Sequence, residues 1–328
     1  MAIPPPVAAR PTLGIDVGGT KIEIALVDGA GTLLRRYRLS TEAGHGPQRV
    51  IAAIAGAVRA RFPDIPGTMG AVGVAVAGQV DSDGVVLGAP NLGWTDVPLR
   101  AELALALGLP VVVLNDVRAA GWAEWTNGAG QGADDVVVLY IGTGVGGSVV
   151  SGGRMLTGAS NSAGELGHMT LVAGGRQCHC RNRGCLEAYV GGWAIGERAR
   201  EAARADPVAG SCLLHLTAGS VEMITGAQVG QAFRAADPLG IRLVEETAAY
   251  LGAAAVGLVN AFNPALLVLG GGVIDGLPEL VPMAEREMRD RALPAAVNSL
   301  TVLPAALANE APALGAATMA RSLLTSSI

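Results

Sequence analysis

Three cysteines and a histidine form the most specific chemical cluster in this sequence. Cys178, Cys180 and Cys185 lie within a stretch of eight residues, and His168 precedes them in the same segment. Three thiolates and one imidazole complete a closed tetrahedral zinc site, which is a structural arrangement that does not activate water. His179 is an alternative ligand, but its place between two ligands would strain a shared site. We therefore predict a structural Zn²⁺ on His168, Cys178, Cys180 and Cys185, with chance clustering of cysteines as the weaker alternative.

A glycine-rich motif near the start of the sequence has the residue types of a phosphate site. It reads Asp16-Val17-Gly18-Gly19-Thr20-Lys21. Glycines let backbone amides approach a phosphate closely, while Thr20 adds a hydroxyl donor and Lys21 a positive charge. The carboxylate of Asp16 can hold Mg²⁺ directly or through water. The alternative is a tight hairpin turn without a ligand, because short motifs of this kind also occur by chance.

A second glycine motif follows an apolar run in the other half of the sequence. It reads Gly142-Thr143-Gly144-Val145-Gly146-Gly147. Two equivalent glycine hairpins that face each other would form a phosphate clamp with one side from each half. A Walker A loop requires GxxxxGK[ST], and a Rossmann fingerprint leads from a strand into a helix, so neither describes these two motifs.

Asn115 and Asp116 stand where the apolar run 111–114 gives way to a helical pattern. The carboxyl ends of strands are where α/β sheets present functional groups. Phosphoryl transfer uses a carboxylate to accept the proton of the attacking hydroxyl group. Asp116 suits this role because aspartate is ionised near pH 7. The alternative is that Asn115 or Asp116 only caps the helix predicted for residues 117–125.

Two further carboxylates flank the cysteine cluster. Glu165 belongs to Glu165-Leu166-Gly167-His168 before it, and Glu187 stands just after it. Both could serve only as hydrogen-bond partners of the metal ligands. They could also accept hydrogen bonds from sugar hydroxyl groups, since a buried polyol site needs fixed acceptors.

Short apolar runs separated by glycines predict the elements that carry these motifs. In the first half we expect strands at 13–17, 22–26, 32–39, 69–76 and 111–114, and helices after Pro47, at 98–107 and at 117–125. In the second half we expect strands at 135–141, 148–151 and 265–269, and helices at 186–205, at 227–262 with a break at Asp237-Pro238, and at 311–324. Residues 208–225 show no clear period. The strand–glycine–strand pattern in both halves indicates an internal duplication.

The composition argues against several classes of protein. No apolar run reaches the roughly 18–20 residues that span a bilayer, and the first residues lack the pattern of a signal peptide. We therefore expect a cytoplasmic protein without a membrane partner, with residues 1–11 as a flexible leader. The net charge is −5 and there is no basic run. A nucleic-acid partner is disfavoured, because binding to DNA or RNA needs a basic stripe.

Taken together, these motifs resemble the ROK family (repressors, open reading frames and kinases). The marks are DVGGTK at 16–21, ND at 115–116, GTGVGG at 142–147, ExGH at 165–168, CxC…GC at 178–185 and GGG at 270–272. The resemblance, from about Thr12 to Arg321, implies an α/β protein with the duplicated ribonuclease-H/actin-like ATPase fold and a cleft between two domains for ATP and sugar. The expected domains are 12–126 with a C-terminal helix at about 311–325, and 127–310 with the zinc loop.

The same resemblance implies a kinase that uses ATP and Mg²⁺ to phosphorylate the 6-hydroxyl group of a hexose, with glucose as the expected substrate. Asp116 is the implied base, and His168 would bind zinc through one ring nitrogen and the sugar through the other. The other implied sugar contacts are Gly78, Asn91, Asn115, Glu165 and Glu187. The implied nucleotide and phosphate contacts are Asp16, Gly18, Gly19, Thr20, Lys21, Gly142, Thr143, Gly144, Gly271 and Gly272. A homodimer or homotetramer is the implied assembly.

Other functions of such a protein stay open as alternatives. The sugar could be N-acetylmannosamine, N-acetylglucosamine, fructose or mannose, and polyphosphate could replace ATP. Arg181 and Val190 stand where the family usually has Gly and Ser, which bears on the rim of the sugar pocket. A repressor would need a helix-turn-helix, and only about a dozen residues precede Leu13. A catalytically inactive sugar- or zinc-holding module is disfavoured because Asp116 and both glycine motifs are present.

Overall fold

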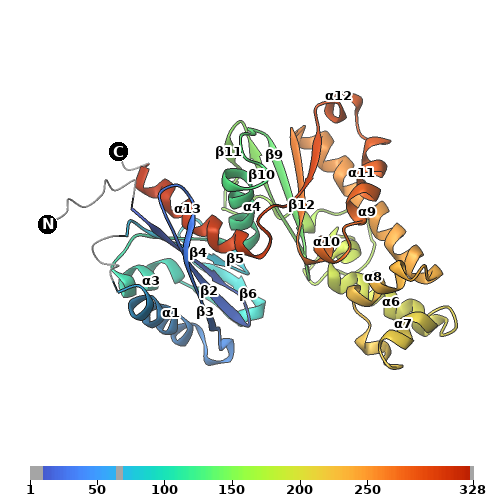
Figure 1. Ribbon diagram of the computed structural model, residues 1–328, viewed down its shortest axis with the longest axis horizontal. Helices are drawn as coiled ribbons and strands as arrows, with labels where there is room; N and C mark the ends of the chain where they lie inside the picture. Colours follow the sequence, from blue (N-terminus) through green and yellow to red (C-terminus); the bar gives the residue numbers. More distant parts are fainter. Residues whose placement is uncertain (1–9, 64–68, 326–328) are drawn as a thin grey trace. The chain divides into compact units, whose positions relative to one another are not determined.

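The computed structural model describes residues 10–63 and 69–325, which fold into two compact units (Figure 1). The first unit takes the chain up to Gly132, the segment Met155–Gly164 and the chain from Ala306 onward; the second takes Ala133–Arg154 and Glu165–Ala305. The expected domain boundaries stay a prediction, and these units differ from them in joining Met155–Gly164 to the first unit. The expected leader lies largely outside the described residues.

A five-stranded sheet forms the centre of the first unit. Its strands are β1 (Thr12–Val17), β2 (Lys21–Val27), β3 (Leu33–Ser40), β4 (Val72–Val76) and β8 (Val111–Asn115), in the order β3-β2-β1-β4-β8. β1, β2 and β3 are antiparallel neighbours, whereas β1, β4 and β8 run parallel. The parallel strands are short apolar runs because helices cover both faces of such a sheet. The strand expected at 69–76 begins only at Val72.

Four α-helices accompany this sheet in the described part of the first unit. They are α1 (Pro47–Arg61), α3 (Leu99–Leu107), α4 (Asp116–Asn127) and α13 (Ala311–Thr325). Figure 1 shows α13, in red at the end of the chain, beside the blue strands from its beginning. This approach depends on Gly14 and Gly73, because a Cβ atom at either residue would lie 1.8 Å from a backbone oxygen of α13. Helix and sheet therefore pack backbone to backbone.

A three-stranded sheet in the first unit was not expected from the sequence. It consists of β5 (Gln79–Val80), β6 (Val86–Ala89) and β7 (Trp94–Val97), with the 3₁₀ turn η3 (Pro90–Leu92) between the last two. Strands this short give too few alternating residues for a period to be read. They fix the loops that contain Gly78 and Asn91.

The second unit repeats the sheet of the first. Its strands are β9 (Val136–Ile141), β10 (Val145–Ser151), β11 (Arg154–Met155), β12 (Leu266–Gly270) and β13 (Thr301–Pro304), in the order β11-β10-β9-β12-β13. As in the first sheet, an antiparallel hairpin precedes parallel strands. The shared order and directions confirm the internal duplication at the level of topology. β13 was not expected from the sequence.

The second unit contains more helix than the first. The helices are α5 (Glu187–Val190), α6 (Gly192–Ala205), α7 (Ser211–Leu216), α8 (Gly226–Arg234), α9 (Pro238–Phe262), α10 (Gly272–Gly276), α11 (Leu280–Arg289) and α12 (Pro294–Val297). The helix expected at 186–205 is divided because Gly191 is extended, with ψ 147°. The predicted break at Asp237-Pro238 is confirmed, since Asp237 caps α9 by accepting from Gly240 N at 2.8 Å.

Residues 208–225, which no period could place, form α7 and the 3₁₀ turn η5 (Val221–Met223). Val190, expected near the rim of the sugar pocket, has no exposed surface and belongs to the hydrophobic core of the second unit. Its side chain packs among other apolar residues, and its bearing on the sugar pocket stays a prediction. Among the described residues, no helix is both long and apolar enough to cross a membrane.

Candidate functional site

The carboxyl ends of β1, β4 and β8 meet at one edge of the first sheet, because these strands are parallel neighbours. β1 leads into the first glycine motif, β4 into Gly78, and β8 ends at Asn115, directly before Asp116. The first unit therefore brings together the predicted magnesium ligand, the predicted base and two predicted sugar contacts. Asn91 joins them, since a Cβ atom on Gly19 would lie 2.9 Å from the carbonyl oxygen of Asn91.

Asn115 is the residue that caps α4. Its Oδ1 atom accepts a hydrogen bond from Arg118 N at 3.0 Å, and its Nδ2 atom donates to the carbonyl oxygen of Gly78 at 3.2 Å and to Asp116 Oδ1 at 3.0 Å. Asp116 Oδ1 also accepts from Val117 N at 2.9 Å. The capping role that the sequence left open between two residues belongs to Asn115, which orients the carboxylate of Asp116 at the same time.

α4 is fixed near both ends by buried charged side chains. Arg118 donates to the side chain and the backbone oxygen of Asn161, at 2.6 and 2.7 Å, and to Ala163 O at 3.0 Å. Glu124, which has no exposed surface, accepts from the backbone N–H groups of Ala306 and Leu307 at 3.1 and 2.8 Å. These contacts hold the helix that begins at Asp116.

Asp16 carries a proton more readily than an ordinary aspartate does. Its burial, followed by the negative charges of Asp116 and Glu23, raises its pKa to about 7. Glu23 lies opposite Asp16 in the β1–β2 pair and binds Arg36 Nε at 2.7 Å and Arg38 Nη2 at 2.8 Å. A bound cation stabilises the ionised form of a carboxylate that is buried beside a second negative charge. This environment fits the predicted role of Asp16 as a magnesium ligand.

The rest of the first glycine motif forms an open turn. Gly18 N donates to Lys21 O at 3.1 Å, and the side chains of Thr20 and Lys21 are exposed. The turn is anchored from β3, since Thr41 N donates to Thr20 O and Thr41 Oγ1 to Gly18 O. The two exposed groups are accessible to an anionic ligand.

Glu187 organises the second glycine motif. Its Oε2 atom accepts from Val145 N at 2.9 Å, and its Oε1 atom lies 3.4 Å from Trp193 Nε1. A Cβ atom on Gly144 would lie 2.5 Å from Glu187 Oε2, so the close approach requires glycine at this position. The structure thus gives Glu187 a local role within the second unit, and its predicted sugar contact stays a prediction.

A cavity of about 460 Å³ lies beside this motif, entirely within the second unit. Its size is typical of small-molecule sites, which measure about 300–1,000 Å³. Of the predicted nucleotide contacts, Gly142, Thr143 and Gly272 line it, whereas Gly144 and Gly271 are their neighbours in the chain. The remaining lining residues are Gly192, Trp193, Ile195, Thr225, Gly226, Ala227, Val273, Gly276 and Leu277.

Sequence reasoning missed most of this lining because it comes from the starts of three separate helices. α6, α8 and α10 begin at Gly192, Gly226 and Gly272. Since glycine has no side chain, the helix backbones themselves form part of the wall. One readable signal was the capping box of Thr225 and Gln228 at the start of α8.

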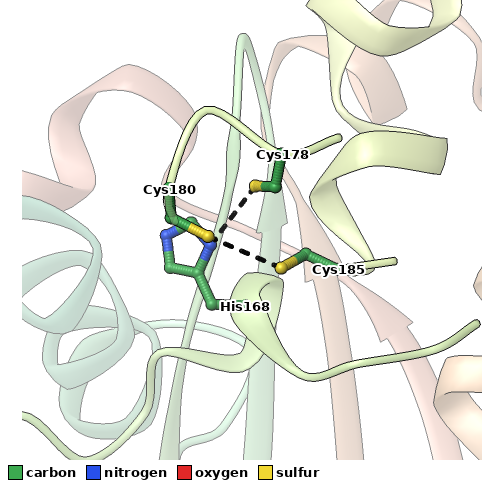
Figure 2. Close-up of side chains that lie close together, drawn as sticks. All are labelled: His168, Cys178, Cys180 and Cys185. Carbon is green, nitrogen blue, oxygen red and sulfur yellow. Dashed lines mark hydrogen bonds between the residues drawn. The ribbon is translucent and has the colours of Figure 1, made fainter. Parts of the chain in front are cut away.

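The four predicted zinc ligands lie together in the second unit (Figure 2). Their ligand atoms are all within 4.8 Å of one another, with Cys178 Sγ 3.7 Å from His168 Nδ1 and Cys180 Sγ 3.6 Å from Cys185 Sγ. Ligands about 2.0–2.3 Å from a tetrahedral zinc ion would lie roughly 3.5–3.8 Å apart. The four residues therefore fit a zinc ion, and the cysteines form no disulfide.

Surrounding groups affect how readily the cysteines of this centre become thiolates. Burial raises the pKa of Cys178 to about 12, which a metal ion reverses by stabilising the thiolate. Asn182 N lies 3.4 Å from Cys180 Sγ and Asn182 Nδ2 lies 3.5 Å from Cys185 Sγ, so backbone and side-chain N–H groups support the sulfurs. His179 is outside the ligand group, and its ring stacks on Trp193.

The predicted sugar contacts are divided between the two units. Gly78, Asn91, Asn115 and Asp116 belong to the first, and Glu165, His168 and Glu187 belong to the second. Glu165 precedes the 3₁₀ turn η4 (Leu166–His168), which packs on β10 because Gly147 and Gly167 leave room for it. As a shared set of sugar contacts these residues stay a prediction.

Comparison with known proteins gives consistent results over nearly the whole chain. A model of the ROK family matches residues 12–322. A glucokinase of Streptomyces coelicolor is 35% identical over 317 residues, which cover 94% of this chain and 97% of that protein.

Solved structures agree with this relationship. A ROK family glucokinase from Streptomyces griseus, crystallised with glucose and AMPPNP, is 36% identical with a TM-score of 0.79, and the match covers 95% of this chain and 99% of that one. A ROK hexokinase from Thermus thermophilus is 34% identical with a TM-score of 0.81, covering 96% and 99%.

Proposed function

The chain belongs to the ROK family, and we propose that it transfers the γ-phosphoryl group of ATP to the 6-hydroxyl group of glucose. The fold prediction is confirmed, because ROK kinases with the actin-like ATPase fold are its structural neighbours. Several relatives of about the same length are glucokinases, one is a kanosamine kinase, and one ROK family glucokinase was crystallised with glucose and an ATP analogue. These relatives support glucose as the sugar and ATP as the phosphoryl donor.

The observation that carries the proposal is the placement of Asp116 beside the first glycine motif. Asp116 is near enough to Asp16 for its charge to raise the pKa of that residue, and hydrogen bonds from Asn115 Nδ2 and Val117 N orient its carboxylate. A phosphoryl-transfer site needs such a base close to its phosphate-binding loop. The proposed base and the proposed phosphate-binding loop lie at the same edge of one sheet.

In the proposed reaction Asp116 accepts the proton of the sugar 6-hydroxyl group as its oxygen attacks the γ-phosphorus atom. The bond from that oxygen to phosphorus forms, the bond from phosphorus to the bridging oxygen breaks, and ADP leaves. The backbone N–H groups and Thr20 of the first motif, with Lys21, would neutralise charge on the phosphates. Gly142, Thr143 and Gly144 would provide the equivalent contacts from the second unit.

Asp16 would hold Mg²⁺, which supplies charge neutralisation on the phosphates when bound. The proposed zinc ion has a different task. His168, Cys178, Cys180 and Cys185 would hold it as a structural ion, since four protein ligands leave no position for water. It would stabilise the loop that follows Glu165 and precedes Glu187.

The cavity of the second unit is the proposed site of the nucleoside. It begins at Gly142 and Thr143 of the second motif and extends to Gly272 and Leu277. A ligand with phosphates at the motif can therefore place its base in an adjoining cavity. This arrangement favours ATP over polyphosphate, because a linear polyphosphate has no group to fill such a cavity.

Identification of the product tests this proposal directly. Purified protein with Mg²⁺, glucose and ATP should give ADP and a phosphate monoester at the 6-oxygen, as observed by ³¹P nuclear magnetic resonance coupled to carbon assignments. Polyphosphate in place of ATP should give little ester. ATP hydrolysis without any sugar ester, or faster reaction with polyphosphate, would contradict the assignment.

A further inference from the structure

Trp193 lies between the metal loop and the cavity of the second unit. It is the second residue of α6 and lines the cavity beside Thr143. Its backbone N–H donates to Thr143 O at 3.2 Å, so the start of α6 is attached directly to the second glycine motif. A shift of this tryptophan would therefore alter the cavity wall next to that motif.

The indole ring is held by two groups outside the cavity lining. The ring of His179 stacks on it with centroids 3.9 Å apart and an angle of 22° between the planes. Trp193 Nε1 lies 3.4 Å from Glu187 Oε1, while the other oxygen of Glu187 binds Val145 N. A stacked partner and a hydrogen-bond acceptor together fix both the tilt and the direction of the indole ring.

His179 belongs to the metal loop without being one of the four predicted ligands. Its side chain is exposed, and it is outside the group of residues that could hold the metal ion. It stands between two of the ligands, Cys178 and Cys180, so that a folded metal loop determines its position. Its stacking contact thus links this loop directly to a residue of the cavity wall.

We propose that Trp193 positions the nucleotide and that His179 acts as a positioning residue through it, so that the metal loop sets the affinity for nucleotide. The inference rests on the proposed ATP site in the cavity. An indole ring held in one orientation presents a fixed wall, and a preorganised site binds more tightly than one that must be ordered by its ligand.

Calorimetric titration of the zinc-loaded protein with AMPPNP and Mg²⁺ tests the inference. His179→Ala should raise the Kd for AMPPNP about fivefold, as expected for loss of one aromatic stack. His179→Phe, which keeps a ring for stacking, should restore the Kd to within about twofold of the wild-type value. His215→Ala changes an exposed histidine on α7 outside the cavity lining and serves as the matched control, with no expected change.

A Trp193→Leu variant tests whether the indole ring carries the effect of His179. Because His179 acts through this ring, adding His179→Ala to Trp193→Leu should not raise the Kd further. The inference is overturned if His179→Ala binds AMPPNP as the wild type does, if His179→Ala and His179→Phe weaken binding equally, or if the effects of the two sites add. Loss of zinc in His179→Ala, measured by elemental analysis, would also overturn it, since the histidine would then be acting on the metal. Failure of the wild-type protein to bind AMPPNP would instead overturn the proposed function.

Discussion

Asp16 lies near the end of β1 and Asp116 directly follows β8 of the same sheet, yet their proposed roles differ. Asp116 is the proposed base, oriented through Asn115 and the first peptide of α4. Asp16 is the proposed cation ligand, and its pKa is raised to about 7 by burial and by its negative neighbours. Substituting each by asparagine keeps the size of the side chain and removes the charge, so the two variants separate catalysis from stability.

Asp116→Asn should reduce kcat by at least 10²- to 10⁴-fold, because general-base catalysis typically contributes about that much. The Kd for glucose should change little, since asparagine still forms polar contacts. Steady-state kinetics and a separate binding titration measure the two quantities. If the variant keeps more than roughly a tenth of the wild-type kcat, Asp116 is not the base.

Asp16→Asn should stabilise the protein against unfolding in the absence of Mg²⁺ and nucleotide, while reducing its activity. A carboxyl group whose pKa is raised on folding contributes stability below its unfolded pKa of about 3.9, and this contribution is lost as the pH rises toward about 7. The stabilisation by the variant should therefore grow from about pH 4 to pH 7 and reach on the order of 2–4 kcal/mol.

Urea unfolding of both proteins at about pH 5 and about pH 8 measures this difference. Asp83→Asn, at an exposed carboxylate, is the control for a general effect of charge. If Asp16→Asn increases the free energy of unfolding equally at the two pH values, the raised pKa of Asp16 does not cause the stabilisation.

At the scale of an element, the metal loop depends on four ligands that come from two short segments. η4 supplies His168, and the turn around Gly184 returns Cys185 toward Cys178 and Cys180. The loop has backbone hydrogen bonds, among them Cys178 N to Asn182 O and Gly184 N to Arg176 O, but it contains no helix or strand of more than one bridge between the described residues Gly175 and Cys185. Its stability should accordingly depend on the ion.

Cys180→Ser should lose most of the zinc and lower the melting temperature by about 10 °C, because structural zinc supplies folding free energy. Cys212→Ser is the matched control, since Cys212 lies on α7 outside the ligand group. Elemental analysis and thermal unfolding of both variants provide the measurement. Freshly prepared, reduced wild-type protein without about one zinc per chain would refute the metal assignment.

At the scale of the whole molecule, motifs and long periodic segments were readable from the sequence. The glycine motifs and the Asn115-Asp116 pair stand at ends of predicted elements, and the zinc ligands, identified by residue type and spacing, do converge. The duplicated sheet followed from the repeated strand–glycine–strand pattern. Local residue types with a fixed spacing carry this information.

What could not be predicted depends on contacts between distant segments. The cavity lining comes from the starts of α6, α8 and α10, and no spacing relates Trp193 to Leu277. Gly14 and Gly73 allow α13 to pack closely on the sheet. A glycine-rich composition alone does not show whether a glycine is needed for such packing or for ligand binding. The side chain of Val190 points into a core that exists only once the chain has folded.

The central claim is that glucose is the preferred substrate, and steady-state kinetics with a panel of sugars tests it most directly. The polar side chains proposed for the sugar site would supply partners for each hydroxyl group of glucose; they are Asn91, Asn115, Asp116, Glu165, His168 and Glu187. A site built around hydroxyl groups discriminates strongly against an analogue that leaves one of them unpaired. With ADP formation as the signal, kcat/KM for glucose should exceed the values for mannose, fructose, N-acetylmannosamine and N-acetylglucosamine. A higher kcat/KM for either N-acetylhexosamine would contradict the assignment to glucose.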